Sequence, residues 1–140
     1  MRLVLAVVLS LTLASCKGDI PVAAYLGIVD HVAKESPAFC IASNERDLPP
    51  VVMQSIRERH SSVHPVSSCK RLKRMFFQTP DGHEVSLVHV DYWRSLSPWH
   101  ARVEIYYETN FMFGAASVTL KLRKVKGEWV VVGESLHSIS

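Results

Sequence analysis

The sequence predicts an α+β domain in which N-terminal helices pack on a curved antiparallel sheet of about four to five strands. Two observations predict it. In the first half of the chain, after residue 20, apolar residues recur at helical spacing. In the second half, apolar and polar residues alternate with a period of two, which is typical of strands with one buried and one wet face. Helices followed by strands indicate that the helices cover one face of the sheet.

The first half predicts two helices and one short strand. A first helix is expected to begin near Pro21, which suits a first turn, with Asp19 as its cap. It ends before Pro37, because the residue before a proline avoids the helical region. Residues 38–42 are expected to form a short strand and residues 50–60 a second helix.

The middle of the chain predicts irregular structure. Residues 61–68 contain Pro65 and four serines and are expected to form a loop. Residues 71–78 are expected to be extended. Pro80-Asp81-Gly82 is a strong turn signal.

The second half predicts the sheet. Residues 85–93 are rich in β-forming side chains, and residues 101–108, 117–125 and 128–132 are further expected strands. Lys126-Gly127 is expected to form the tight turn of the last hairpin.

Length and composition limit the number of domains and the class of protein. The chain has 140 residues, enough for one domain, with 48% hydrophobic and 21% charged residues, which is ordinary for a globular protein. The formal net charge is +3, and Arg2 contributes one of those charges from the leader. This excess is too small to indicate nucleic-acid binding, and no nucleic-acid partner is expected.

The N-terminus has the pattern of a secretory signal peptide. Met1-Arg2 supplies a positive start, and residues 3–13 are free of charge. This apolar run is too short to span a bilayer, which needs about 20 residues. The alternative is a buried N-terminal helix or strand, but Lys17-Gly18-Asp19 breaks the run at once.

Leu13-Ala14-Ser15-Cys16 resembles the lipobox of bacterial lipoproteins. The resemblance implies cleavage before Cys16 and acylation of its sulfur and amino group, with palmitate among the usual chains, and two or more acyl chains anchor a protein stably. It also implies a signal peptide at 1–15 and a lipidated tether at 16–20, and the length of the remaining chain then predicts a single α+β domain at 21–140. Lys17 in place of an aspartate implies the outer membrane, facing the periplasm. The alternative is ordinary cleavage after Ala14, which releases a soluble protein.

The cysteine count becomes even if Cys16 is acylated. Cys40 and Cys69 then remain, in an exported chain where disulfides persist. We expect a Cys40–Cys69 bond, which closes a loop of about 30 residues and contributes roughly 3–4 kcal/mol. The alternative is two separate buried thiols.

The second half of the chain, VHVDYW, ARVEIYYE and ASVTLKLRKVKGEWVVV, resembles the cystatin-like and ketosteroid-isomerase-like α+β cone. The resemblance implies that Trp129 packs under the helices. It also allows a pocket in which a carboxylate acts as a base. His89 and Asp91 lie two apart on one side of a predicted strand and are the weak catalytic candidates; the alternative is a polar sheet face.

The other candidate sites are histidines, basic residues and aromatic residues. His60 and His64 are four apart, but Pro65 argues against a continuous helix, and neither a metal nor a cofactor is expected. A basic cluster beside Cys69 either meets an anionic surface or discourages edge-strand aggregation; it comprises Lys70, Arg71, Lys73 and Arg74. Trp93 and Trp99 either line a groove or sit at the core edge, and Phe111 and Phe113 either touch a partner or are buried.

The function expected from the sequence is that of a membrane-anchored periplasmic lipoprotein, a non-enzymatic binding or envelope-assembly accessory. The competing class is an enzyme that acts on an envelope small molecule or glycan through a pocket in the cone. A deep pocket with convergent polar groups favours the enzyme, and an exposed apolar patch favours the accessory.

Overall fold

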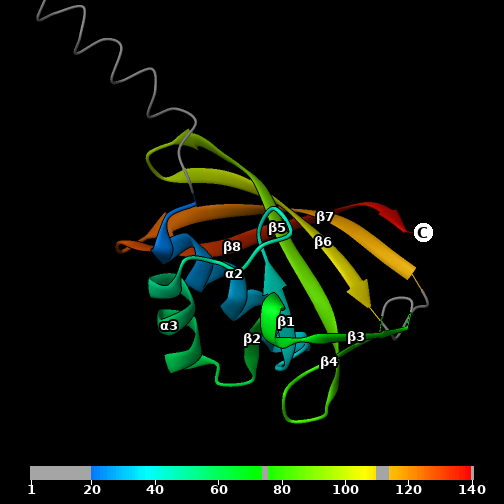
Figure 1. Ribbon diagram of the computed structural model, residues 1–140. Coiled ribbons are helices and arrows are strands. Elements are labelled where there is room, and N and C mark those ends of the chain that lie inside the picture. Colours follow the sequence, from blue (N-terminus) through cyan, green and yellow to red (C-terminus); the bar gives the residue numbers. More distant parts are fainter. Residues whose placement is uncertain (1–19, 74–75, 110–113, 140) are drawn as a thin grey trace, which may run out of the picture.

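The computed structural model describes residues 20–73, 76–109 and 114–139, which form two α-helices and one eight-stranded sheet (Figure 1). The elements in chain order are α2 (Val22–Glu35), β1 (Phe39–Ala42), α3 (Pro50–Arg59), β2 (Val63–Pro65), the short 3-10 helix η2 (Val66–Ser68), β3 (Lys70–Lys73), β4 (Phe76–Gln78), β5 (Glu84–Ser97), β6 (His100–Thr109), β7 (Gly114–Val125) and β8 (Glu128–Ile139). The predicted signal peptide and the lipobox-like segment with Cys16 lie outside the described residues. Neither described helix has the length and apolar character needed to cross a bilayer.

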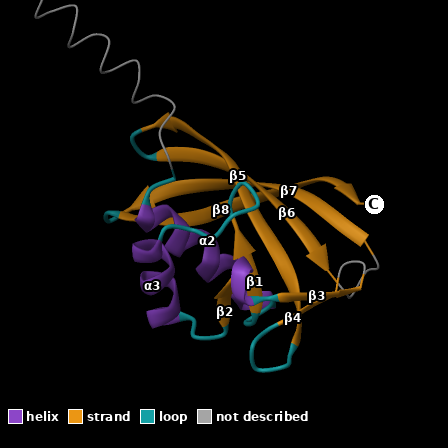
Figure 2. Cartoon of the chain, in the orientation of Figure 1, coloured by secondary structure: helices purple, strands orange, loops and turns teal. Residues whose placement is uncertain are grey.

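The main sheet has the order β2-β1-β5-β6-β7-β8, and β4 joins β3 to the start of β5. The four long strands β5 to β8 are antiparallel, whereas β1 runs parallel to both β2 and β5. The mixed helix-and-sheet class is confirmed (Figure 2). The expected count of four to five antiparallel strands is wrong, because β2 lies in the expected loop and the extended segment forms the β3–β4 hairpin.

Helix α2 packs closely against β8. Its buried residues Ala24, Ile28 and Val32 recur every four positions and face the core. A Cβ added at Gly27 would lie 2.2 Å from the carbonyl oxygen of Trp129, so only glycine fits at this crossing. The helix ends at Glu35, just before Ser36-Pro37, as the proline predicts.

The long strands give the sheet two different faces. In β6, Val103 and Ile105 are buried in the core with the helices, whereas Glu104 and Tyr106 point the other way. The alternation predicted for residues 101–108 is therefore confirmed. We call the side that faces the helices the inner face and the opposite side the outer face.

A second, smaller core covers one end of the outer face. It consists of Cys40, Ala42, Phe77, Val85 and Leu87. Strand β1 is buried on both faces, so it contributes to this core and to the main one. The expected Cys40–Cys69 disulfide is present in the structure and ties the start of the β3–β4 hairpin to β1.

Candidate functional site: a groove on the outer face

A cavity of about 660 Å³ opens on the outer face beside the second core. We call it the groove and define it by its charged and aromatic lining residues on β3, β5 and β6: Arg71, His89, Asp91, Tyr92, Glu104, Tyr106 and Glu108. Period two places His89 and Asp91 on the same side of β5, and the antiparallel register places Tyr106 and Glu104 opposite them. The groove therefore follows directly from strand pairing.

The end of the groove next to the second core is electrostatically paired. The Glu108 carboxylate lies 3.3 Å from an Arg71 guanidinium nitrogen and 3.8 Å from His89 Nε2. The Arg71 guanidinium also lies over the Phe77 ring, 4.7 Å from its centroid. Since Arg71 belongs to β3 and Glu108 to β6, these contacts hold the β3–β4 hairpin over the outer face.

The other end of the groove is acidic. Asp91 Oδ1 accepts a hydrogen bond from the Asn44 backbone N–H at 2.9 Å. Glu104 is the direct cross-strand partner of Asp91, and in the described part of the chain its carboxylate forms no ion pair or hydrogen bond. Like charges placed directly opposite each other destabilise a sheet, so this pair costs stability.

The backbone around Asp91 is strained. Asn44 and Glu45 have φ of 50° and 62° at the tip of the turn closed by Ser43 and Arg46, and Tyr92 has φ of 54° within β5. Positive φ at non-glycine residues is sparsely populated, and such residues gather at functional sites. The hydrogen bond from Asn44 to Asp91 joins two of these strained segments.

A second cavity, of about 560 Å³, lies across this turn from the groove. It is lined by Ile20, Tyr25 and Trp93, and it shares Asp91 and Tyr92 with the groove. Tyr92 is 78% exposed, so its ring is available at the boundary between the two cavities.

Both of the weak catalytic candidates border the groove, but they have different partners. His89 contacts Glu108 and the Tyr106 ring, whereas Asp91 binds the Asn44 backbone. Ser117 also lines the groove, and among the described residues no hydroxyl or thiol forms a hydrogen bond with His89. The structure thus brings the two candidates into one cavity without placing a nucleophile against a base.

The other histidines singled out from the sequence lie apart from the groove. His60 caps the end of α3 and contacts Asp30 at 2.6 Å, whereas His64 lies in β2, 3.9 Å from Asp81. Burial, followed by the nearby Arg57 charge, lowers the pKa of His64. Within the described ranges, no group of three or more metal-ligating side chains is found.

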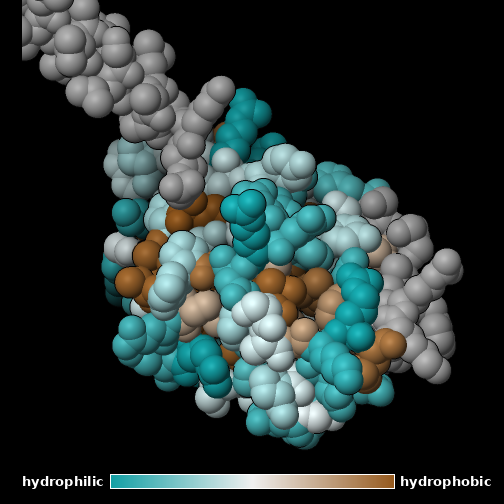
Figure 3. All heavy atoms as spheres, viewed as in Figure 1, coloured by the Kyte–Doolittle hydropathy of each residue, from teal (hydrophilic) through white to brown (hydrophobic). Residues whose placement is uncertain are grey.

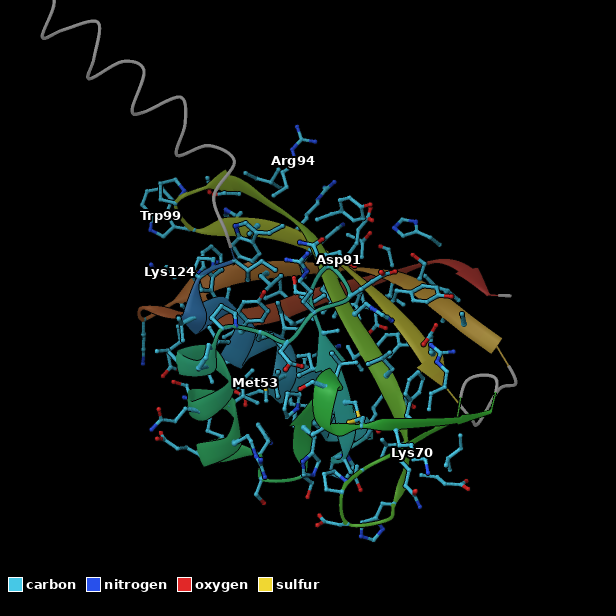
Figure 4. The ribbon with its side chains drawn as sticks, viewed as in Figure 1. Met53, Lys70, Asp91, Arg94, Trp99 and Lys124 are labelled. Carbon is cyan, nitrogen blue, oxygen red and sulfur yellow. A yellow bond between two sulfur atoms is a disulfide. The ribbon has the colours of Figure 1, made fainter. Side chains whose placement is uncertain are left out.

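The predicted basic cluster is divided. Arg71 lies in the groove, Lys70 lies on β3 at the end of the molecule away from Trp99 (Figure 4), and the side chains of Lys73 and Arg74 lie outside the described residues. The aromatic predictions also divide. Trp93 packs edge-on against Trp129, with centroids 5.4 Å apart, whereas Trp99 is 61% exposed.

Phe111 and Phe113 lie outside the described residues. Trp129 itself is buried, 8% exposed, where α2 crosses β8.

The sequence did not identify Glu45, Glu104, Tyr106 or Glu108 as site residues. The signal available was the alternation of residues 101–108, which places Glu104, Tyr106 and Glu108 on one wet face. Which of them faces His89 and Asp91 depends on the register between β5 and β6.

Comparison with protein-family models, with curated proteins and with solved structures finds no match. The resemblances to bacterial lipoproteins and to the α+β cone therefore stay predictions.

Proposed function

We propose that this chain is a bacterial lipoprotein, anchored through Cys16 at the outer membrane and facing the periplasm, whose groove binds a positively charged group of an envelope protein or small molecule. Support for the anchor comes from the lipobox Leu13-Ala14-Ser15-Cys16. Because Cys40 and Cys69 pair with each other, Cys16 is left without a disulfide partner among the three cysteines and is available for acylation.

The observation that carries the binding proposal is the opposition of Asp91 and Glu104 in an open cavity. A sheet gains nothing from two carboxylates directly across from each other. Glu45 lines the same end of the groove, and in the described part of the chain it has no ion pair either. A bound ammonium or guanidinium group would neutralise this end of the groove.

Aromatic rings support the same choice of ligand. Tyr92 is 78% exposed and Tyr106 is 39% exposed, both at the groove. Cations bind over such ring faces, and ring faces and carboxylates together favour a cation over an anion. On the face shown in Figure 3 the surface is mostly hydrophilic, with apolar side chains in small separate groups, which suits a polar ligand.

Binding is favoured over catalysis because the side chains that could act as acid or base are already held by contacts within the protein. Arg71 and His89 face Glu108, and Asp91 holds the Asn44 backbone. The enzyme alternative, an acid–base reaction of His89 and Asp91 on an envelope small molecule or glycan, rests on their shared cavity.

The ligand test is calorimetric titration of the lipidated chain, in neutral detergent, with tetra-arginine amide. We expect binding that weakens with salt, and no binding of tetraglutamate. Glu104→Gln should weaken binding about five- to tenfold, the equivalent of roughly 1–1.4 kcal/mol. Glu58→Gln, which removes an exposed carboxylate from α3, should change nothing. Equal binding of both peptides, or equal effects of both substitutions, would contradict the groove proposal.

The anchor test is mass spectrometry of the protein extracted from membranes. The expected N-terminal peptide begins at a triacylated Cys16, and Cys16→Ser should abolish the modification. An unmodified N-terminus at Ser15 would refute the anchor while leaving the groove experiment intact.

A further inference from the structure

The end of the domain formed by the β5–β6 hairpin carries an unusual row of positive charge. Arg94, Arg102 and Lys121 are direct cross-strand neighbours on β5, β6 and β7. All three are exposed, and in the described part of the chain none of them forms an ion pair. Like charges in register destabilise a sheet, so the row indicates an anionic partner outside the domain.

Apolar side chains project beside this row. Leu96 is 49% exposed and Trp99 is 61% exposed at the β5–β6 turn, and Val125 is 43% exposed at the β7–β8 turn. The Trp99 carbonyl accepts a hydrogen bond from the Lys124 N–H at 2.8 Å, so the two turns form one continuous surface. We call these residues the tip: Arg94, Leu96, Trp99, Arg102, Lys121 and Val125.

The tip lies at the end of the domain where the described chain begins. Ile20 and Trp93 line the same cavity, and Trp93 is followed directly by Arg94. Figure 4 shows Arg94, Trp99 and Lys124 near this end, with Lys70 at the opposite end. Ile20 is four residues from Cys16, and four residues span at most about 14 Å.

We propose that the tip docks on an anionic phospholipid bilayer, with Trp99 and Leu96 in the interface and the cationic row against lipid phosphates; this rests on the proposed anchor at Cys16. A domain tethered within about 14 Å must meet the membrane with one of its ends. The end nearest the tether combines an exposed tryptophan with unpaired cations, the composition that favours interfacial binding. Each cation near such a surface strengthens binding about fivefold.

The test uses the lipidated chain in vesicles of phosphatidylcholine with 25% phosphatidylglycerol, and in vesicles of phosphatidylcholine alone. Tryptophan fluorescence is measured with lipids brominated high on the acyl chains, and Trp99→Phe identifies the part of the signal that belongs to residue 99. We expect strong quenching of Trp99 in the anionic vesicles. Arg102→Gln with Lys121→Gln should shift the docking equilibrium about thirtyfold and reduce quenching to the level of neutral vesicles.

The matched control is Lys34→Gln with Arg57→Gln, which removes two cations from the helices and should leave quenching unchanged. Flotation of the vesicles in 1 M salt reports the anchor separately. Protein that floats but whose Trp99 is unquenched, or is quenched equally in both vesicle types, overturns the docking proposal and leaves the anchor standing. Protection of the tip from proteolysis in whole cell envelopes, without quenching of Trp99 in these vesicles, assigns the tip to a protein or glycan and also overturns the proposal. Protein that does not float refutes the anchor and with it the docking that rests on it.

Discussion

Replacing Glu104 with glutamine should make the protein more stable and less able to bind a cation. Glu104 lies directly across from Asp91, and in the described part of the chain no cation is paired with either carboxylate. Glutamine keeps the shape of the side chain and removes its charge. Cross-strand pairs contribute about 0.2–1 kcal/mol, and exposure to solvent screens this pair, so we expect a gain of about 0.5 kcal/mol.

The assay is scanning calorimetry at low ionic strength and again in 1 M sodium chloride. For a domain of this size, about 0.5 kcal/mol raises the melting temperature by about 2 °C. The gain should vanish at high salt, where the Debye length falls to about 3 Å. Asp91→Ala provides the contrast, because it relieves the same repulsion but also removes the hydrogen bond to the exposed Asn44 N–H, so it should be less stable than Glu104→Gln by about 1 kcal/mol.

Loss of stability in the Glu104→Gln variant would refute the reasoning, because it would mean that the carboxylate makes a favourable contact within the fold. A gain in stability with unchanged binding of tetra-arginine amide would support the repulsion between Asp91 and Glu104. It would refute the proposal that the groove binds a cation. Only a variant that is more stable and binds the peptide more weakly is consistent with both parts of the reasoning, namely that the Glu104 carboxylate lowers the stability of the fold and contributes to binding of the cation.

Three further predictions concern the fold. Gly27→Ala should destabilise the protein by about 1–3 kcal/mol in urea unfolding, because its Cβ would lie 2.2 Å from the Trp129 carbonyl oxygen. Reduction of the Cys40–Cys69 bond should cost about 3–4 kcal/mol, measured by urea unfolding with and without dithiothreitol. Burial lowers the pKa of His64, so below pH about 6.5 the unfolded chain takes up a proton that the folded chain resists. Stability should therefore fall from pH 7 to 5, and less steeply in His64→Gln.

Each of these predictions has its own control. Gly133→Ala should cost little, since its nearest neighbour would be the flexible Lys121 side chain at 3.5 Å. An equal effect at both glycines would show that the contact with Trp129 is not the cause. A reduced protein as stable as the oxidised one would contradict the assigned role of the disulfide. Identical pH slopes with and without His64 would remove it as the titrating group.

The elements that the sequence predicted best are those with strong local signals. Alternation in β6 and the proline after α2 fixed their limits within a few residues, and Lys126-Gly127 is the turn between β7 and β8, with φ of 51° and 79° at these residues. Strand β2 has only three residues and ends in a proline, so it carries no period to detect. Its place in the sheet depends on parallel pairing with β1, a contact made by chain distant in sequence.

The local sequence pattern is not sufficient to predict which residues face each other in the groove. The same-side placement of His89 and Asp91 follows from period two, but their partners depend on two irregularities in β5. Counting back from the tight turn, where Ser97 pairs with His100, a regular ladder would place Asp91 opposite Tyr106. The two register shifts place it opposite Glu104 instead, and one of them contains Tyr92 with its positive φ. The sequence around Tyr92 contains no signal that predicts this bulge.

The two proposed surfaces share the outer face, and their charges divide it along the strands. On β6, Glu108 and Glu104 belong to the groove and Arg102 to the tip. From Trp99, a strand rise of about 3.3 Å per residue places Glu104 roughly 16 Å and Glu108 roughly 30 Å further along the sheet. Both distances exceed the Debye length of about 8 Å, but Arg102 of the tip lies only two residues, about 7 Å, from Glu104, so a bilayer held by Arg102 reaches the acidic end of the groove and leaves the Glu108 end beyond that distance. An anionic surface attracts the tip and repels the groove, and so the same charge pattern that makes each site also directs the groove away from the membrane.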